Sequence, residues 1–266
     1  MPNVHTDASW LTACTYAVRQ LGGKNGSVKE GKCEIQWATN GRKAKWQAAL
    51  RFNPSSDLHV FYQVWVWLQY RPVVDYMRPW VAMSDKLNII DAGANVGFTT
   101  LYLKSQFPSA NIVSLEPESS NYIQLKSNVA ANNLQEITLL NAGLWQREAY
   151  LEVGRDFGDH REWSFYVKEV AEPTDLRGYD VPTLMKQMQW TRVDLLKIDI
   201  EGAERYLFTD DNSALNTLRN VRFLAIEIHD VYPIREKICK YLEQYGFDFF
   251  DKGELTIGRN RNMASQ

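Results

Sequence analysis

The sequence has few cysteines and no long apolar run. Cys14, Cys33 and Cys239 stand far apart in a chain of 266 residues. Their odd number and wide spacing exclude a disulfide framework and paired-cysteine zinc motifs, so we expect reduced thiols as in a cytosolic protein. The most apolar stretch, 60–68, is too short to cross a bilayer, and the N-terminus lacks the basic and then apolar order of a secretory signal. We therefore expect a cytoplasmic protein without a membrane span.

An excess of charge of one sign is also missing. Lysine and arginine together number 30 against 32 aspartates and glutamates, which gives a formal net charge of -2. Nucleic-acid-binding proteins usually carry a basic stripe, so we expect no nucleic-acid partner. Hydrophobic residues make up 45% and aromatic residues 12% of the chain, enough apolar surface for one large core. The composition favours one large domain, alone or with an N-terminal extension.

The chain divides near Ser84 into two parts. In the first part, the glycine-rich segment 22–41 predicts loops with one short strand at 34–37. Apolar residues at helical spacing predict a helix from Asp57 to Tyr70, capped by Asp57 and ended by Pro72. We expect residues 1–84 to form a helical and loop extension and residues 85–266 to form the main domain.

The second part alternates between strands and helices. This alternation predicts parallel βαβ units with helices on both faces of the sheet, and a closing hairpin predicts that the sheet is mixed. The expected strands are 87–91, 111–116, 136–141, 194–200 and 222–228, with β-like pieces at 149–153 and 163–167 and the hairpin at 247–250 and 255–258; the expected helices are 98–107, 118–132, 181–188 and 233–245.

The strongest local motif is IIDAGANVGFTT at 89–100. An apolar strand ends at Asp91, glycines follow at 93 and 97, and a helix begins near residue 98, with Thr99 as a candidate cap. Glycine lets the backbone pass close to a ligand. The dinucleotide fingerprint G-x-G-x-x-G fails here, and no Gly-Lys-Ser/Thr follows. The turn therefore suits a ligand with a positive centre and no pyrophosphate, such as S-adenosylmethionine.

Two polar residues at later strand tips strengthen this interpretation. Glu116 ends the next strand, in IVSLEP, 19 residues after Gly97. An acidic side chain at this tip can accept hydrogen bonds from both ribose hydroxyls. Asn141, in LLNAGLW, either reaches the adenine or forms an Asx turn. We expect Glu116 to bind the ribose.

A second group of charged residues lies in VDLLKIDIEGAE at 193–204 and in FLAIEIHD at 223–230. Strand alternation places Lys197 and Asp199 on one face, and Glu227 and His229 on one face of the later strand. Buried charges are costly unless paired. If the strands are neighbours in register, Lys197 meets Glu227 and Asp199 meets His229. The alternative is a purely structural ion network.

The order of IIDAGANVGFTT, SLEP, NAGL, LLKIDIEGAE and LAIEIH resembles the FkbM-type methyltransferase family, a branch of the class I methyltransferases. The resemblance covers about 57–258. It implies a Rossmann-like α/β fold with a seven-stranded, mostly parallel sheet of order 3-2-1-4-5-7-6, and O-methylation of a sugar or polyketide-like hydroxyl. It also implies S-adenosylmethionine as cofactor, and the expected cofactor residues are Asp91, Gly93, Ala94, Asn95, Gly97, Glu116, Asn141 and Asp199.

An alcohol is a poor nucleophile until its proton leaves, so a base or a Lewis acid assists the transfer. We expect His229 to be the base and Asp199 to orient it, with Lys197 and Glu227 as further catalytic residues. The rival mechanism uses a divalent metal at the oxygen-rich cluster of Asp199, Glu201, Glu227, His229 and Asp230, with Asp199, Glu227 and His229 as its ligands. A metal-dependent enzyme of catechol type and a non-catalytic S-adenosylmethionine-binding module therefore remain as alternatives.

The expected acceptor region has weaker signals. We expect the extension, 1–84, to cap the acceptor side of the S-adenosylmethionine-binding catalytic domain at 85–266. Trp145, Trp163 and Tyr166 suit a wall on which a sugar ring stacks, although aromatic core positions are the commoner explanation. The loop 154–164, which includes His160, matches no motif. The sequence leaves the acceptor and the oligomeric state unassigned.

Overall fold

A seven-stranded sheet forms the centre of the computed structural model, which describes residues 12, 15–16, 24–29, 32–38, 45–52, 55–155 and 165–263. Its strand order is β6-β5-β4-β11-β12-β14-β13. When these seven strands are numbered 1 to 7 along the chain, this is the expected order 3-2-1-4-5-7-6. Neighbouring strands are parallel except for β14, which runs antiparallel to β12 and β13. The strands are β4 (Asn88–Ala92), β5 (Asn111–Leu115), β6 (Ile137–Leu140), β11 (Val193–Ile198), β12 (Val221–Glu227), β13 (Phe247–Lys252) and β14 (Leu255–Asn260).

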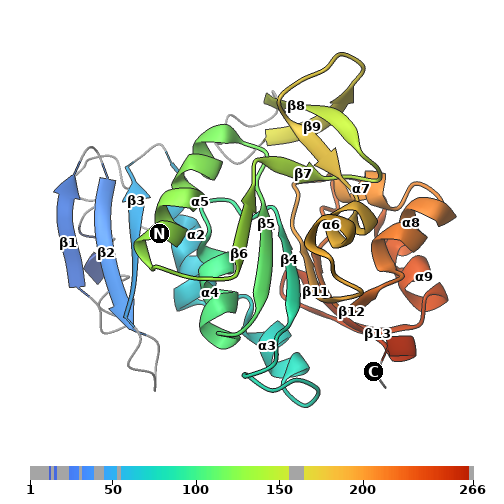
Figure 1. Ribbon diagram of the computed structural model, residues 1–266, viewed down its shortest axis with the longest axis horizontal. Coiled ribbons are helices and arrows are strands. Elements are labelled where there is room, and N and C mark those ends of the chain that lie inside the picture. Colours follow the sequence, from blue (N-terminus) through green and yellow to red (C-terminus); the bar gives the residue numbers. More distant parts are fainter. Residues whose placement is uncertain are drawn as a thin grey trace.

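Helices cover both faces of this sheet, as predicted (Figure 1). Successive residues of one strand point to opposite faces, so Ile89 belongs to one apolar core and Ile90 to the other. The first core includes residues of α4 (Phe98–Gln106) and α5 (Ser119–Ala131), and the second includes residues of α6 (Val181–Met188), α7 (Glu204–Leu207), α8 (Asp211–Leu218) and α9 (Arg235–Gln244). Burial from both sides explains why every residue of β11 is buried.

No helix in the described part of the chain is long and apolar enough to cross a membrane.

A smaller four-stranded sheet of order β7-β10-β8-β9 continues from the central one (Figure 1). It contains β7 (Ala142–Leu144), β8 (Ala149–Arg155), β9 (Phe165–Val170) and β10 (Arg177–Tyr179). The sequence predicted β8 and β9 but not β7 and β10, because three residues are too few to show a strand period. Residues 156–164, with His160 and Trp163, lie outside the described residues.

The N-terminal part contains three antiparallel strands where loops and one strand were expected: β1 (Lys24–Lys29), β2 (Lys32–Ala38) and β3 (Lys45–Arg51). Helix α5 binds the outer edge of β3 through amide side chains. The Ala49 N–H donates to Asn128 Oδ1 at 2.9 Å, and Gln124 Nε2 donates to the Ala49 carbonyl at 2.8 Å. Tryptophans of β2 and β3 also join the first core. The extension therefore packs directly on the catalytic fold.

The single helix expected at 57–70 is interrupted. Helix α2 (Asp57–Phe61) continues as a π-helix, η1 (Tyr62–Val66), and α3 (Arg71–Met77) follows. Pro72 lies in the first turn of α3, where its missing N–H is not needed, so it does not end the earlier helix as predicted. Asp57 is not the cap either, because the N-cap is Ser56 and the buried Asp57 carboxylate pairs with Arg51 at 2.7 Å.

Candidate active site

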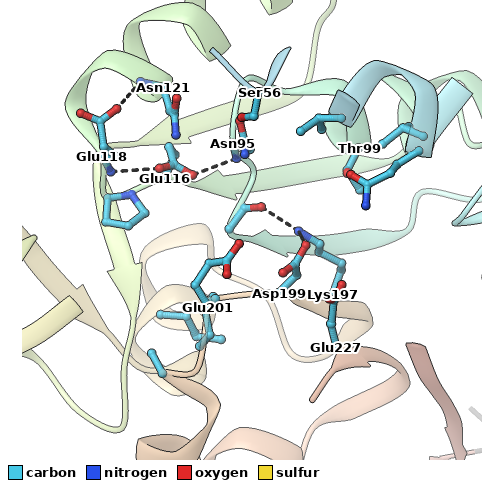
Figure 2. A pocket seen from close by; sticks show the side chains of 18 of the residues that line it. Ser56, Asn95, Thr99, Glu116, Glu118, Asn121, Lys197, Asp199, Glu201 and Glu227 are labelled. Atoms are coloured by element: carbon cyan, nitrogen blue, oxygen red, sulfur yellow. Dashed lines mark hydrogen bonds and ion pairs between the residues drawn. The ribbon is translucent and has the colours of Figure 1, made fainter. Parts of the chain in front are cut away.

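A cavity of about 380 Å³ opens at the carboxyl ends of β4, β5, β11 and β12 (Figure 2). Ligands of open α/β sheets bind at this edge, and the volume is in the range of small-molecule sites. The wall is formed mainly by α2 with η1, the turn after β4, the tip of β5, the β11–α7 connection and the end of β12, and residues of α4, α5, β7 and β9 complete it. The expected residues Gly93, Asn95, Glu116, Lys197, Asp199, Glu227 and His229 all line it.

The turn after β4 requires glycine. Gly93 has a φ of +76°, and a Cβ built on it would lie 1.7 Å from the Asp199 carbonyl oxygen. Gly97 has a φ of +92° and is the N-cap of α4. Thr99 is therefore not the cap, although it lines the cavity from the first helical turn. The N–H of Ala94 donates to the Leu115 carbonyl at 2.9 Å, so this residue fixes the turn.

Glu116 lies at the tip of β5 and is almost fully buried. Its Oε2 accepts from the Asn95 N–H at 2.8 Å, and its Oε1 accepts from the Glu118 N–H at 2.9 Å (Figure 2). Burial raises the pKa of Glu116 to about 7, and the two hydrogen bonds oppose this rise. Each carboxylate oxygen has a second acceptor position. Glu116 can therefore still accept hydrogen bonds from hydroxyl groups of a ligand in the cavity.

Asn141 stabilises this turn from the next strand. Its side-chain amide donates to the Glu116 carbonyl at 2.8 Å and to the Pro117 carbonyl at 3.1 Å. These contacts use the amide protons for the backbone of the turn. The structure thus places Asn141 in a supporting position behind Glu116.

Lys197 holds the glycine turn against β11. Its Nζ donates to the Gly93 carbonyl at 2.7 Å and lies 3.3 Å from Asp91 Oδ1 and 3.7 Å from Asp199 Oδ2. Burial lowers the pKa of Lys197, but the carboxylates of Asp91 and Asp199, with the Tyr70 hydroxyl, outweigh it and raise that pKa overall. Asp91 is fully buried and also accepts from Thr100 Oγ1 at 2.7 Å. Lys197 and Asp91 therefore stabilise the glycine turn from within the sheet.

The expected pairing of Lys197 with Glu227 is wrong. The parallel register places Lys197 opposite Ala225, two residues before Glu227. The Lys197 ammonium therefore reaches the β4 side of β11, where Asp91 and the turn carbonyls lie. A register between strands that are distant in sequence depends on the packing of the helices between them, which strand alternation alone does not specify.

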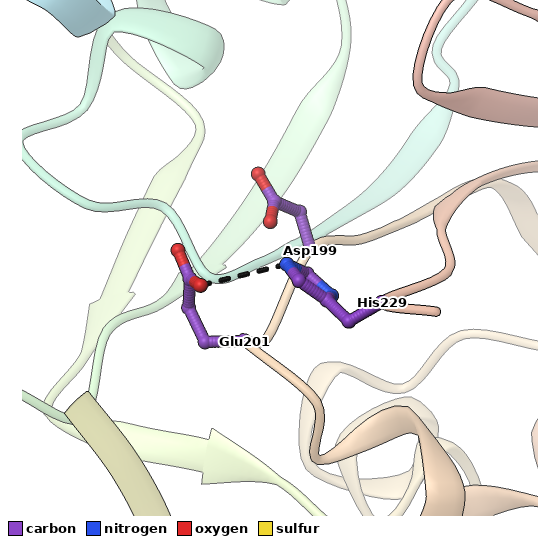
Figure 3. Close-up of side chains that lie close together, drawn as sticks. All are labelled: Asp199, Glu201 and His229. Atoms are coloured by element: carbon purple, nitrogen blue, oxygen red, sulfur yellow. Dashed lines mark ion pairs between the residues drawn. The ribbon is translucent and has the colours of Figure 1, made fainter. Parts of the chain in front are cut away.

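His229 lies between Glu204 and Glu201, and Figure 3 shows its ion pair with Glu201. Its Nδ1 is 2.9 Å from Glu204 Oε1 and its Nε2 is 3.4 Å from Glu201 Oε2. Burial lowers the pKa of His229, but both glutamates raise it, to about 11. The imidazole is thus protonated at neutral pH and acts as a donor in this arrangement. The partner of Nδ1 is Glu204, where Asp199 was expected.

Sequence reasoning missed Glu204, which is fully buried and also accepts from the N–H groups of Ile200 and Gly202 at 3.3 Å each. It is the last residue of the IEGAE segment, 200–204. The sequence signal that could have indicated it was a second glutamate shortly after the end of a strand. Sequence reasoning also missed the cavity residues His59, Gln63 and Gln69, which come from the N-terminal extension.

Three side chains at the strand tips could bind a cation together. Single ligand atoms of Asp199, Glu201 and His229 all lie within 4.8 Å of one another (Figure 3). The metal set expected from the sequence had Glu227 in place of Glu201. Burial, and then repulsion from Asp199, raises the pKa of Glu227 to about 8. Once ionised, as the pH approaches 8, the Glu227 carboxylate is a stronger proton acceptor than an ordinary glutamate, and the cluster can alternatively bind a hard cation.

The expected aromatic wall is not formed by Trp145. This side chain is buried, its ring centroid lies 4.6 Å from that of Tyr206, and its indole N–H donates to Glu169 at 3.0 Å. It is a core residue between the small sheet and α7. Tyr166 is half-buried beside Gly154, in β9 and β8. Trp163 lies outside the described residues.

One protein family and three known proteins are similar to the chain. Residues 91–249 match the methyltransferase FkbM domain. The chain is 30% identical to methyltransferase sdnD of Sordaria araneosa over 193 residues, which are 60% of this chain and 73% of that protein. It is 26% identical to methyltransferase 1 of Beauveria bassiana over 136 residues, which are 44% of this chain and 55% of that protein. The N-terminal domain of human METTL16, solved with SAH, is 12% identical and aligns with a TM-score of 0.47 over 97% of this chain and 84% of that one. The chain belongs to the FkbM methyltransferase domain family and is an S-adenosylmethionine-dependent methyltransferase.

Proposed function

We propose that this enzyme methylates a hydroxyl group of a sugar or another small hydroxylated metabolite. The observation that carries the proposal is the set of carboxylates at one end of the cavity, Asp199, Glu201 and Glu227. A hydroxyl becomes a competent nucleophile only as it loses its proton, and partly buried carboxylates can accept that proton. In Figure 2, Glu227 lies beyond Lys197, on the side away from Glu116.

The other end of the cavity supports the position of the cofactor. S-adenosylmethionine supplies a methyl group on a positively charged sulfur. Gly93 leaves room for a ligand against the backbone, and Glu116 has acceptor positions for two ribose hydroxyls. We assign Asn95 and Gly97 to cofactor binding as parts of the same turn. We assign Asp199 to the positively charged end of the cofactor, since Asp199 lines the cavity.

The proton acceptor is assigned to Glu227. Its carboxylate lies 3.9 Å from His229 Nε2, which is too long for a hydrogen bond, so the oxygens are available to an acceptor hydroxyl. His229 carries its own proton between Glu201 and Glu204, so we assign it to orienting the acceptor or the carboxylate. This assignment replaces His229 as the base.

Transfer of labelled methyl from S-adenosylmethionine to saccharide and polyketide hydroxyls tests the proposal. Glu227→Gln should lower kcat by about 10² to 10⁴ with little change in cofactor affinity. Wild-type turnover by this variant would overturn the base assignment. Cofactor binding without transfer to any hydroxyl would favour the non-catalytic binding module.

A metal-dependent O-methyltransferase is the second candidate, favoured by the cluster of Asp199, Glu201 and His229. Glu204 holds the second imidazole nitrogen, as outer carboxylates do for metal-binding histidines. Assays with a chelator separate the two candidates. Full activity in chelator would remove the metal, and activity restored by magnesium or manganese would establish it.

A further inference from the structure

One wall of the cavity carries neutral polar side chains from the N-terminal extension. His59, Gln63 and Gln69 line it from α2, η1 and the turn that follows. Burial lowers the pKa of His59, so this imidazole is neutral at pH 7. A neutral amide or imidazole can both donate and accept hydrogen bonds, as a hydroxyl does.

The helix that forms this wall changes from α-helical to π-helical geometry beside the cavity. In η1 the Trp67 N–H donates to the Tyr62 carbonyl at 2.8 Å, a bond that spans five residues and widens the helix by one residue. Gln63 and Val64 lie within this wider turn and contact the cavity. Such π-helical turns occur often at functional sites. This wall is therefore suited to contact a ligand.

Another wall of the cavity is acidic. Asp199, Glu201 and Glu227 line it, the Glu227 carboxyl ionising only toward its raised pKa of about 8, and the carboxylates of Asp91 and Glu204 lie behind it. Among the described residues of the cavity wall, the cations are Lys197 and His229. Lys197 contacts the Gly93 carbonyl and two aspartates, and His229 lies between two glutamates. Both cations are therefore already engaged by the protein.

We propose that the acceptor subsite, defined as His59, Gln63, Gln69, Glu201 and Glu227, binds an uncharged polyhydroxylated molecule and rejects acceptors that carry a carboxylate or a phosphate. The inference rests on the proposed O-methylation and specifies its substrate class. Carboxylates accept hydrogen bonds from acceptor hydroxyls. The neutral side chains of His59, Gln63 and Gln69 can donate to or accept from the other hydroxyl groups of the same molecule. An anion in this space faces like charges in a site of reduced dielectric, which disfavours it strongly.

A matched pair of probes tests the charge selection. Phenyl β-glucoside and phenyl β-glucuronide differ by a hydroxymethyl and a carboxylate group on the same ring. With S-adenosylhomocysteine present, calorimetry should give a Kd for the glucuronide that is weaker by about 10-fold to 100-fold. Equal or tighter glucuronide binding would overturn the proposal, and so would the absence of binding by both probes. If neither probe binds but methyl is transferred to a non-saccharide hydroxyl, the proposed charge selection fails and the proposed O-methylation does not.

A charge introduced into the neutral wall provides a gain-of-function test. Gln63→Lys should shift the preference between the two probes toward the glucuronide by about tenfold or more. Gln187→Lys, at an exposed position of α6, is the control and should leave the preference unchanged. A shift cannot come from misfolding, because misfolding removes binding of both probes. No shift in a Gln63→Lys protein that still binds S-adenosylhomocysteine would overturn the proposal.

Discussion

The backbone N–H of Asn95 donates a hydrogen bond of 2.8 Å to the Glu116 carboxylate. This bond connects the turn after β4 to the tip of β5, and Asn95 adopts a φ of +49° to make it. The glycine turn and the ribose acceptor are therefore fixed relative to each other before any ligand binds. A preorganised site loses less conformational entropy on binding.

Replacement of the Glu116 carboxylate tests its role directly. Glu116→Gln removes the charge but keeps the shape, and we expect S-adenosylhomocysteine affinity to fall by about 10-fold to 100-fold, because hydrogen bonds to charged groups contribute about 1.5–3 kcal/mol. Glu172→Gln, an exposed position, is the control. Calorimetry measures both. Unchanged affinity in Glu116→Gln would remove the ribose assignment.

The raised pKa of Glu116 predicts two opposite pH dependences. Its ordinary value of 4.5 rises to about 7 in the folded protein, so between these values the folded state binds more protons than the unfolded state. The stability contribution is therefore fully present below pH 4.5 and is lost as the pH rises to about 7. Affinity for S-adenosylhomocysteine should instead increase with pH by up to about tenfold per unit below the pKa, since the ionised form is the better acceptor. Titrations from pH 5 to 8 check this, and a Glu116→Gln protein with the same slope would contradict it.

Gly93→Ala should abolish cofactor binding and lower the melting temperature. The added Cβ would overlap the Asp199 carbonyl oxygen, and a φ of +76° is strained for alanine. Gly253→Ala is a matched control, because Gly253 also has a positive φ, of +63°, with nothing within 4 Å of its added Cβ. This control should lose about 1–2 kcal/mol of stability and keep its affinity. Equal losses of affinity in both variants would show that backbone strain alone, without the overlap, explains the effect.

Lys197→Met should destabilise the fold by about 3–5 kcal/mol, because it leaves the buried Asp91 carboxylate without its cation. The double variant Lys197→Met with Asp91→Asn should recover part of this loss, since both charges are then absent. Urea unfolding measures the free energy in each variant. A Lys197→Met protein as stable as wild type would show that the pair contributes nothing to folding.

Most of the central fold could be predicted because its strands are continuous apolar runs that end at polar or breaker residues. The helix predicted at 181–188 has these same bounds in the structure, with Asp180 as its cap. Of the three N-terminal strands only β2 was predicted, at 34–37, where exposed and buried residues alternate. In β1 glycine and lysine interrupt any apolar alternation, and β3 was missed although its burial also alternates. The π-helical turn at 62–66 leaves no distinct pattern in the sequence.

Site residues could be predicted where one short sequence motif determines their positions relative to one another. Gly93 and Glu116 lie at strand tips whose positions follow from the apolar runs before them, and Gly97 lies at the start of the helix that follows the first of these tips. The partners of Lys197 and His229 were not predictable in this way, because they depend on the register between strands and on where α7 begins. Glu204 faces His229 only because the chain turns back after Gly202.

The central claim is that the turn at 93–97 and Glu116 together bind S-adenosylmethionine. Calorimetric titration of the wild-type protein with S-adenosylmethionine and S-adenosylhomocysteine tests it most directly. The account predicts one site per chain with a Kd in the micromolar range for each compound. Neither heat of binding nor a shift in melting temperature at millimolar concentrations of either compound would contradict it.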